Sequence, residues 1–338
     1  MDNKLPTIKE IANRLNVSVS TVSRALHNHP SIGLRTKMQV QQLAKELNYE
    51  PNQKAIFFKQ GETFTIGVIL PNLREEYFSI AINGIEDVAI KNKYNVIISQ
   101  SHDDPEREKQ IVDTMRKSRV DGIVVSIAKN TINFDHFLQL ENFNIPVVFF
   151  DRVPADIKTS KVMQDDYHGA FEAVRHLITN GYRRIAHISA TKELTITQKR
   201  LQGYIDALQK HNLPIREEWI IYSGFSQESG EKDTYELLKC KIKPDAIFAL
   251  NDRKAVGVMV ALKNKKITIG KQMGVIGFAD DPVASVITPT LTTISVPAVD
   301  IGKISCELLF KHIKKKNFSP QETTLPCELI VRESTIKK

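Results

Sequence analysis

The sequence predicts a small all-α head over residues 1–50 and a larger α/β body after it. Three observations lead to this prediction. Apolar residues recur at helical spacing in the first fifty residues, short runs rich in valine and isoleucine alternate with helical stretches from residue 64 onward, and basic residues are concentrated before residue 60. With 338 residues, the chain is long enough for two or three domains with cores of their own.

The head is expected to contain three short helices. Thr7 stands three residues before Glu10, which is the spacing of a capping box. Apolar residues then follow at i, i+3, i+4 and i+7: Ile8, Ile11, Ala12 and Leu15. Ser18 is placed to cap a second helix. The inward positions of the second and third helices are Val22, Ala25, Leu26, Val40, Leu43, Ala44 and Leu47.

The second helix of the head has an outer face of an unusual kind. Its residues are small or hydrogen-bonding, with one long cation among them: Val19, Ser20, Thr21, Ser23, Arg24 and His27. Such a face has little use in an apolar core and suits the major groove of DNA. The pattern therefore favours a helix-turn-helix, and an ordinary amphipathic helix pair that covers some other domain is the alternative.

Charge supports a polyanionic partner for the head. Residues 1–60 hold nine basic and four acidic side chains, a balance of +5, whereas the rest of the chain holds 38 and 35. A basic head on a nearly balanced body is typical of nucleic-acid binding, although a solvated basic face without a partner has the same composition.

Composition excludes several other classes. No apolar run approaches the eighteen residues of a membrane span, and the N-terminus does not resemble a secretory signal. The three cysteines, Cys240, Cys306 and Cys327, are far apart and lack metal-ligand spacing. We therefore expect a cytoplasmic protein without metal or other cofactor and without a membrane partner.

The body is expected to contain parallel sheets covered by helices. Buried strands are predicted at 63–70, 94–100, 121–127, 145–151, 183–189, 218–223, 245–250 and 274–279. Helices are predicted near 76–91, 104–118, 133–142, 166–180, 197–211, 227–240 and 252–264. These units are too many for one compact sheet, so two similar lobes are favoured, with a ligand cleft where the strand C-termini face each other.

The segments TIKEIANRLNVSVSTVSRAL and NYEPNQKA resemble the lactose-repressor (LacI/GalR) family of bacterial transcription factors, and the similarity continues to ELIVREST. The resemblance implies a periplasmic-binding-protein-like core crossed three times, near Met163, Leu291–Thr292 and Glu322–Thr323. It implies a helix-turn-helix domain over 1–50, a hinge helix and linker over 51–63, and an effector-binding and dimerisation domain over 64–338. The N-terminal lobe is expected over 64–162 and 292–322, and the C-terminal lobe over 163–291 and 323–338.

The resemblance also assigns DNA contacts. It implies base contacts for Val19, Ser20 and Arg24, and a guanidinium such as that of Arg24 can bind guanine O6 and N7 together. Backbone contacts are expected from Thr21, Ser23, His27, Tyr49 and Asn52, where His27 stands at a position that the family usually fills with asparagine.

The hinge departs from the family at its most important position. Pro51 ends the third helix, and residues 52–59 are long enough for about two marginal helical turns. The family inserts a leucine of this helix between base pairs in the minor groove, and Phe58 occupies that place here. Phenylalanine is also used as such a wedge. Alternatively, Phe57 and Phe58 pack between the two hinges of a dimer.

Effector contacts are implied for residues at strand ends and helix starts. By resemblance they are Asp151, Arg200 and Asn251, and an ion pair across the cleft is the alternative for the first two. The family usually has two acids after glycine and an aromatic residue, but here Gly277-Phe278-Ala279-Asp280 lacks the first, so Asp280 is a less direct match. Tyr77, Phe78 and Trp219 are candidates for a surface that faces a sugar ring, although a lone tryptophan more often belongs to a core.

These features predict an allosteric transcriptional regulator, expected to be a repressor. It would bind a palindromic operator as a homodimer and respond to a small-molecule effector, expected to be a sugar or sugar derivative, between the lobes. A sugar-transport receptor shares the core but needs a signal peptide and no basic head. An enzyme would use Asp151, His168 or Asp280 as acid or base, but the sequence has no nucleophile elbow, metal cluster or cofactor loop.

Overall fold

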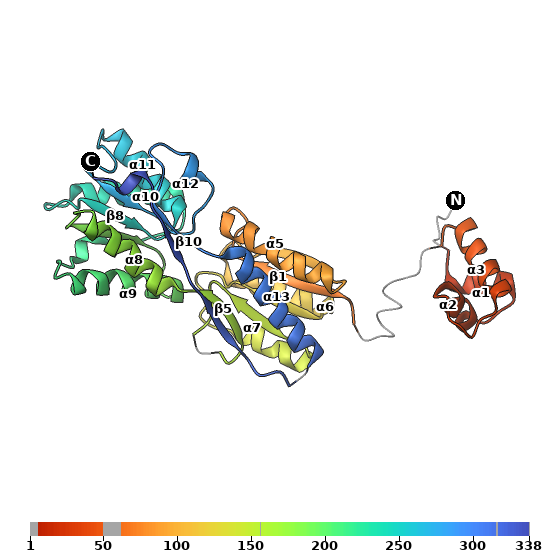
Figure 1. The fold of residues 1–338 in the computed structure, drawn as a ribbon. Helices are drawn as coiled ribbons and strands as arrows, with labels where there is room; N and C mark the ends of the chain where they lie inside the picture. Colours follow the sequence, from red (N-terminus) through yellow and green to blue (C-terminus); the bar gives the residue numbers. More distant parts are fainter. Residues whose placement is uncertain (1–5, 50–61, 156, 316, 338) are drawn as a thin grey trace. The chain divides into compact units, whose positions relative to one another are not determined.

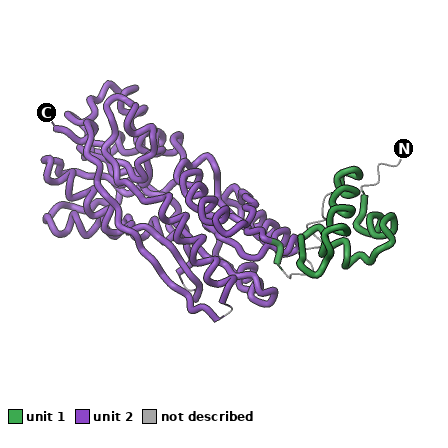
Figure 2. The backbone as a smooth tube through the Cα atoms, turned by 45° about the vertical axis from the view of Figure 1, so that its right-hand side comes forward, with its two compact units in different colours: residues 1–63 green, residues 64–338 purple. Residues whose placement is uncertain are grey.

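A computed structural model describes residues 6–49, 62–155, 157–315 and 317–337. The chain forms two compact units, residues 1–63 and residues 64–338 (Figure 2). The hinge helix expected at 52–59 lies outside the described residues.

The first unit contains three helices, α1 (Ile8–Leu15), α2 (Val19–Leu26) and α3 (Leu34–Glu46). The hydroxyl oxygen of Thr7 accepts a hydrogen bond from the amide of Glu10, and that of Ser18 accepts one from the amide of Thr21, so both expected caps are confirmed. The expected inward positions are also confirmed, because the core consists of Ile11, Ala12, Val22, Ala25, Val40 and Ala44 with Ile8, Leu15, Leu26, Leu43 and Leu47 packed against it.

The second unit has two halves in space, each built on its own parallel sheet, and the first half contains a six-stranded sheet. Its order is β11-β5-β4-β3-β1-β2, and every pair is parallel. The strands are β1 (Thr65–Leu70), β2 (Asn95–Gln100), β3 (Gly122–Val125), β4 (Val147–Phe150), β5 (Ser160–Gln164) and β11 (Glu322–Leu325). Helices α5 (Glu76–Lys91) and α13 (Ala298–Lys314) share a core with one face, while α6 (Pro105–Lys117), α7 (Asp135–Leu138) and the 3-10 helix η1 (Gln139–Phe143) share a core with the other.

Helix α5 is held against α13 by two small residues. A side chain at Gly84 would collide with the carbonyl of Val299, and one at Gly302 would collide with the carbonyl of Ala81. This close approach fixes α5 on the sheet, and with it the residues of its first turn, which line the pocket described below.

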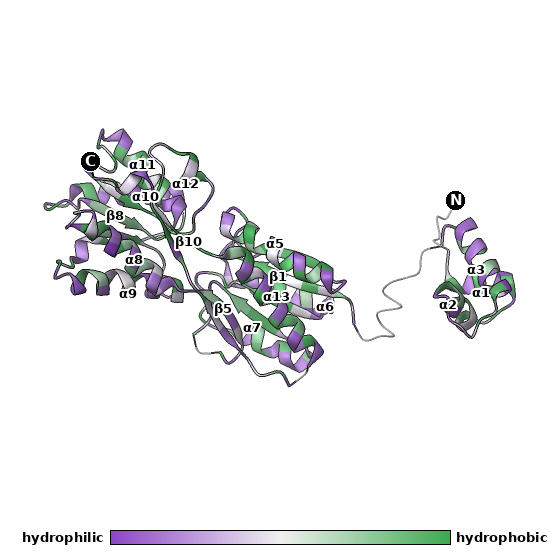
Figure 3. Ribbon diagram, in the orientation of Figure 1, coloured by the Kyte–Doolittle hydropathy of each residue, from purple (hydrophilic) through white to green (hydrophobic). Residues whose placement is uncertain are grey.

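The second half, where Figure 1 labels β8 and the helices around it, is built on a four-stranded sheet. Its order is β7-β6-β8-β9, and every pair is parallel. Its strands are β6 (Ile185–Ser189), β7 (Ile220–Tyr222), β8 (Ala246–Ala249) and β9 (Gly274–Ile276). Helices α8 (Asp166–Thr179) and α9 (Thr195–Lys210) cover one face, and α10 (Gln227–Lys239) and α11 (Asp252–Asn264) cover the other. Figure 3 shows the apolar residues gathered on the strands and on the helix faces turned toward them. The remaining short elements are the 3-10 helices η2 (Glu217–Trp219) and η3 (Glu333–Thr335) and the helix α12 (Val283–Val286).

The chain passes three times between the two halves, and all three passages lie a few residues beyond the expected positions. The boundary expected between 162 and 163 falls inside β5, which stays paired with β11 as far as Gln164. Strand β10 (Thr293–Ser295) pairs antiparallel with β12 (Glu328–Ile330) and continues the second sheet through bridges at Thr292 and Ser295, so the boundary at 292 is wrong. Strand β11 belongs to the first sheet through its pairing with β5, so the boundary between 322 and 323 is also wrong. The chain therefore leaves the second sheet only after β10 and leaves the first sheet only after β11.

Candidate DNA-binding and effector-binding sites

The outer face of α2 is available for contact in the first unit. Val19 is 40% exposed, and Ser20, Arg24 and His27 are exposed as well. Thr21 and Ser23 are half-buried. The structure therefore places the three expected base-contacting residues on one accessible helix surface, while Val22 and Ala25 hold the opposite face in the core.

Local hydrogen bonds already engage several of the expected backbone-contacting residues. The hydroxyl of Ser18 lies 2.8 Å from the hydroxyls of both Ser20 and Thr21, at the N-terminus of α2. Nδ1 of His27 lies 2.8 Å from the carbonyl oxygen of Ser23, which places its ring over the last turn. Tyr49 packs against the core of this unit, and the expected contacts of Asn52 and Phe58 fall outside the described residues.

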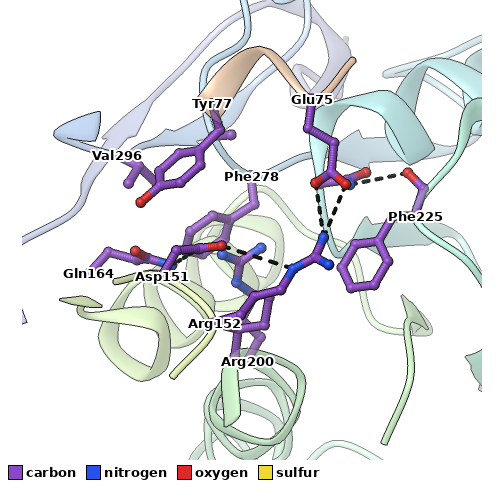
Figure 4. A pocket seen from close by; sticks show the side chains of 12 residues that line it. Glu75, Tyr77, Asp151, Arg152, Gln164, Arg200, Phe225, Phe278 and Val296 are labelled. Atoms are coloured by element: carbon purple, nitrogen blue, oxygen red, sulfur yellow. Dashed lines mark hydrogen bonds and ion pairs between the residues drawn. The ribbon is translucent and has the colours of Figure 1, made fainter. Parts of the chain in front are cut away.

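A pocket lies between the two halves of the second unit, at the carboxyl ends of their strands (Figure 4). The first half contributes residues from the start of α5 and the ends of β4 and β5, and the second half contributes residues from α9 and from the loops after β7, β8 and β9. The lining residues are Glu75, Tyr77, Asp151, Arg152, Gln164, Ile196, Arg200, Phe225, Asn251, Phe278, Ala279 and Val296. Four of the seven expected effector contacts, Tyr77, Asp151, Arg200 and Asn251, thus meet in one place.

Arg152 is the central cation of this pocket, and sequence reasoning did not identify it. Its guanidinium donates to both carboxylate oxygens of Glu75, at 3.0 and 3.1 Å, and to Oδ1 of Asp103 at 2.8 Å. The ring of Phe225, from the other half, lies 4.3 Å from the guanidinium carbon. Arg152 is 1% exposed, so its charge depends on these partners. The only sequence signal was its position directly after Asp151 at a strand end.

A second set of buried polar groups surrounds Asp151. Nε2 of Gln164 donates to Oδ1 of Asp151 at 2.9 Å and lies 3.3 Å from both carboxylate oxygens of Asp166. Arg200 donates to Asp166 at 2.7 Å and to the carbonyl of Leu250 at 2.5 Å. The alternative of a direct ion pair between Asp151 and Arg200 is therefore not what the structure shows, because Asp166 takes that place.

Electrostatics around Asp151 are unfavourable to its ionised form. Burial raises the pKa of Asp151 above its ordinary value, and the nearby Asp166 acts in the same direction. Arg152, Gln164 and Arg200 oppose that rise. The pKa of Asp166 is raised by burial too, against the influence of Arg200.

Asn251 lines the pocket as expected, but its amide also organises the chain. Its Oδ1 accepts from the amide of Lys254 and so caps α11, and its Nδ2 donates to the carbonyl of Phe225 at 3.2 Å. Tyr77 lines the pocket from the first turn of α5, as Figure 4 shows. Both residues remain candidates for effector contact.

Three other expected contacts are not in the pocket lining. Phe78 is 1% exposed and packs in the core against Phe150, with the centre of its ring 5.3 Å from that of Tyr77. Trp219 is fully buried in the core of the second half and donates from Nε1 to the carbonyl of Ile242 at 3.0 Å. Asp280 accepts from Arg332 at 2.7 Å.

Ala279 lines the pocket where the family places an acid. Its φ is 124°, and that of Asp280 is 58°. With the backbone turned in this way, Asp280 pairs with Arg332 and does not take the place of the missing carboxylate. His168, a residue of the enzyme alternative, is exposed on α8 and does not line the pocket.

The described part of the chain contains no group of three or more histidine, cysteine or acidic residues placed to hold a metal ion. Among the described helices, none has both the length and the apolar character required to cross a membrane.

Two further carboxyl groups lie close to residues of the pocket. Asp281 is in the loop after β9, and Asp252 is the first residue of α11. Burial raises the pKa of Asp281 to about 7, and Asp252, Glu76 and Glu75 add to the rise while Arg253 opposes it. Burial also raises the pKa of Asp252 to about 6, although the hydroxyl of Thr293 and the amide of Asp281 donate to it. Carboxyl groups of both halves therefore oppose one another's ionisation near the cleft.

Comparisons with known proteins agree with this architecture. Residues 7–52 match the family model of bacterial regulatory proteins of the lacI family, and residues 174–335 match a periplasmic binding protein-like domain. The chain is 31% identical to catabolite control protein A of Priestia megaterium, over 97% of this chain and 99% of the relative.

Solved structures show the same likeness. The lac repressor dimer bound to operator and an anti-inducer gives a TM-score of 0.86 at 24% identity, over 98% of this chain and 100% of that chain. A LacI family regulator from Enterococcus faecium with bound ribose gives 0.73 at 26% identity, over 81% of this chain and 99% of that chain.

We predict that replacing Asp281 with asparagine stabilises the protein at pH 8. The raised pKa means that the folded state holds more protons than the unfolded state between about pH 4 and pH 7, so the free energy of unfolding falls as pH rises through that range. Removing the charge should recover about 2–4 kcal/mol at pH 8 and little at pH 4. Urea denaturation at both pH values measures this difference.

The matched control is Asp87→Asn, because Asp87 is exposed on α5. This control should have a small effect on the free energy of unfolding, and the effect should be the same at pH 4 and pH 8. A variant at Asp281 whose stability relative to the parent does not depend on pH would contradict the prediction.

Proposed function

The chain belongs to the lacI family of bacterial regulatory proteins, which are transcriptional regulators and not enzymes, and from this premise we propose how it acts. It is a DNA-binding transcriptional regulator. We propose that it represses transcription in the cytoplasm by binding a palindromic operator as a homodimer, and that a sugar-like effector in the pocket controls this binding. The observation that carries the proposal is the joint presence of an exposed α2 face and a polar pocket between two sheets.

The head is proposed to read DNA through α2. Val19, Ser20 and Arg24 contact base edges, and Thr21, Ser23, His27, Tyr49 and Asn52 contact the backbone. Support comes from the exposure of Val19, Ser20 and Arg24 on one helix face. Phe58 is proposed as the minor-groove wedge on the strength of its position in the sequence.

Dimerisation is proposed to use the edge of the six-stranded sheet. Strand β2 ends that sheet and carries Ile97 at 44% and Ile98 at 36% exposure, and Ile90 is 71% exposed at the end of α5. An exposed apolar edge strand is a favourable surface for a second chain. Two heads are needed because one head carries few base contacts, and a twofold dimer requires two half-sites.

The effector is proposed to be a sugar or sugar derivative. The pocket combines carboxylate, amide, guanidinium and hydroxyl groups with aromatic rings, which together can bind adjacent hydroxyls and a sugar ring. The Enterococcus faecium relative holds ribose, and the ribose operon repressor of Haemophilus influenzae is 29% identical to this chain.

The effector is proposed to change operator affinity by shifting the two halves relative to each other. A ligand that contacts both halves stabilises one arrangement over another, and it shifts the equilibrium only by its difference in affinity for the two. In a dimer, such a shift changes the distance between the two hinge segments and so the placement of the heads on DNA.

We predict that Arg24→Ala relaxes sequence selectivity. A guanidinium bound to guanine contributes about 1–3 kcal/mol of discrimination, so the variant should lose that much affinity for the operator and its base preference at one position of each half-site. The measurement is selection of binding sites from a random DNA library, followed by fluorescence anisotropy with the selected operator. Arg14→Ala is the control, because Arg14 lies on α1 and pairs with Glu10 at 2.7 Å. An Arg24 variant with unchanged base preference would exclude the assigned contact.

We predict that Ile97→Glu dissociates the dimer. A carboxylate on both copies of the edge strand would be desolvated beside its own symmetry mate. Analytical ultracentrifugation should show a monomer, and operator affinity should fall with it. Ile132→Glu is the control, since Ile132 is 80% exposed but lies outside the strand. If the Ile97 variant remains a dimer, the interface lies elsewhere.

We predict reciprocal coupling between effector and operator. If a ligand changes operator affinity by some factor, operator DNA must change the affinity for that ligand by the same factor. Isothermal titration of the ligand into free protein and into the protein–operator complex measures both. Identical ligand affinities in the two titrations would rule out allosteric control through this pocket.

A further inference from the structure

The guanidiniums of the pocket are already paired with carboxyl groups. The lining contains two carboxyl groups, those of Glu75 and Asp151, and two guanidiniums, those of Arg152 and Arg200. Two more carboxyl groups outside the lining, those of Asp103 and Asp166, pair with these guanidiniums. All six side chains are linked by hydrogen bonds or ion pairs within this cluster or to Gln164. A ligand that enters the pocket therefore meets guanidiniums whose charge is already compensated by carboxyl groups.

Neither guanidinium has an uncompensated charge for an anion. Arg152 already contacts Glu75 and Asp103, and its face lies against Phe225. Arg200 contacts Asp166 and the carbonyl of Leu250, and its guanidinium carbon lies 3.7 Å from the centre of the Phe278 ring. A phosphate or carboxylate group would have to displace one of these carboxylates to obtain a counter-charge.

Two other cations near the cleft, Lys199 and Arg253, do not offer an anion a free positive charge either. Lys199 lowers the pKa of Asp166, and Arg253 lowers that of Asp281, so both act on carboxyl groups already present. Neither side chain is among the lining residues of the pocket.

The polar atoms left without a partner are of the kind that hydroxyl groups satisfy. In the protein alone, Oη of Tyr77, Nε of Arg152 and Oε1 of Gln164 are buried and have no hydrogen-bond partner. Figure 4 shows these three side chains around the same space. One is a donor, one is an acceptor and one can be either, so a ligand with several hydroxyls can pair all three.

We infer that the effector of this chain is an uncharged or amine-bearing sugar, and that the pocket excludes sugar phosphates and sugar acids. The inference rests on the proposed function and narrows its ligand class. Asp151 is the group that an amine would meet, because its carboxylate receives one short hydrogen bond, from Gln164, and otherwise lies 3.4 Å from the hydroxyl of Ser126 and 4.0 Å from Nε of Arg152. An ammonium group of the ligand beside Asp151 would stabilise the ionised carboxylate, which burial deprives of water.

The test compares ligands that differ only in charge. Glucose, galactose and mannose are each offered with their 2-amino, 6-phosphate and uronic acid counterparts to the full-length protein at constant ionic strength. The shift in thermal unfolding is followed by titration calorimetry for every probe that stabilises the protein. We expect binding by neutral or amine members, and at least about tenfold weaker binding by the phosphate and acid of the same sugar, a difference of roughly 1.4 kcal/mol.

A charge-removing variant tests the cause of this selectivity. Glu75→Gln leaves Arg152 with one fewer carboxylate partner, so the ratio of phosphate affinity to neutral-sugar affinity should rise about tenfold or more. Glu76→Gln is the matched control, because Glu76 makes the same change of charge one residue away, is exposed and does not line the pocket. Its ratio should stay that of the parent. A merely structural effect of Glu75→Gln would weaken all ligands together and leave the ratio unchanged, which would overturn the inference.

The remaining outcomes separate the inference from the proposed function. A phosphate or acid that binds more tightly than its neutral parent and changes operator affinity would overturn the inference and support the regulator. If no probe of any charge class stabilises the protein or changes operator binding, the sugar-effector part of the proposed function fails, and the inference fails with it.

Discussion

The effector pocket depends on the burial of one guanidinium. Arg152 is almost fully removed from solvent, and a buried charge of this kind is tolerated only where opposite charges and hydrogen bonds compensate for its lost hydration. Glu75 and Asp103 provide them from segments 77 and 49 residues away in the chain. The same contacts hold the start of α5 at the cleft and place the guanidinium against the ring of Phe225. They also compensate the positive charge that an anionic ligand would need as its partner.

Much of this arrangement follows from sequence pattern. Parallel strands end at the same edge of a sheet, so polar residues directly after apolar runs could be expected to meet. Asp151 and Asn251 do so, and helices α5 and α11 have the bounds that their periodicity indicates. The apolar residues at helical spacing in the three helices of the head also predict its core, because a three-helix unit of this size has few other ways to bury them.

The rest depends on contacts that sequence does not encode locally. Arg152 and Gln164 acquire their roles from partners in other segments, and nothing in their own neighbourhood distinguishes them from other polar residues at strand ends. Asp280 could not be placed because a left-handed backbone turn at Ala279 decides where its carboxylate lies. The lone Trp219 fits a core as well as a ligand site, and the crossings shift because β5, β10 and β11 stay with their sheets.

The two ends of the chain use electrostatics at different ranges. Basic residues of the head act through solvent, where screening limits attraction to about 8 Å at physiological salt, and they favour a polyanion whatever its sequence. Charges in the pocket are buried, so solvent screens them little and their pairing with one another is strong. Because the two charge patterns differ, the proposed DNA-binding face and the proposed effector pocket are suited to ligands of different charge.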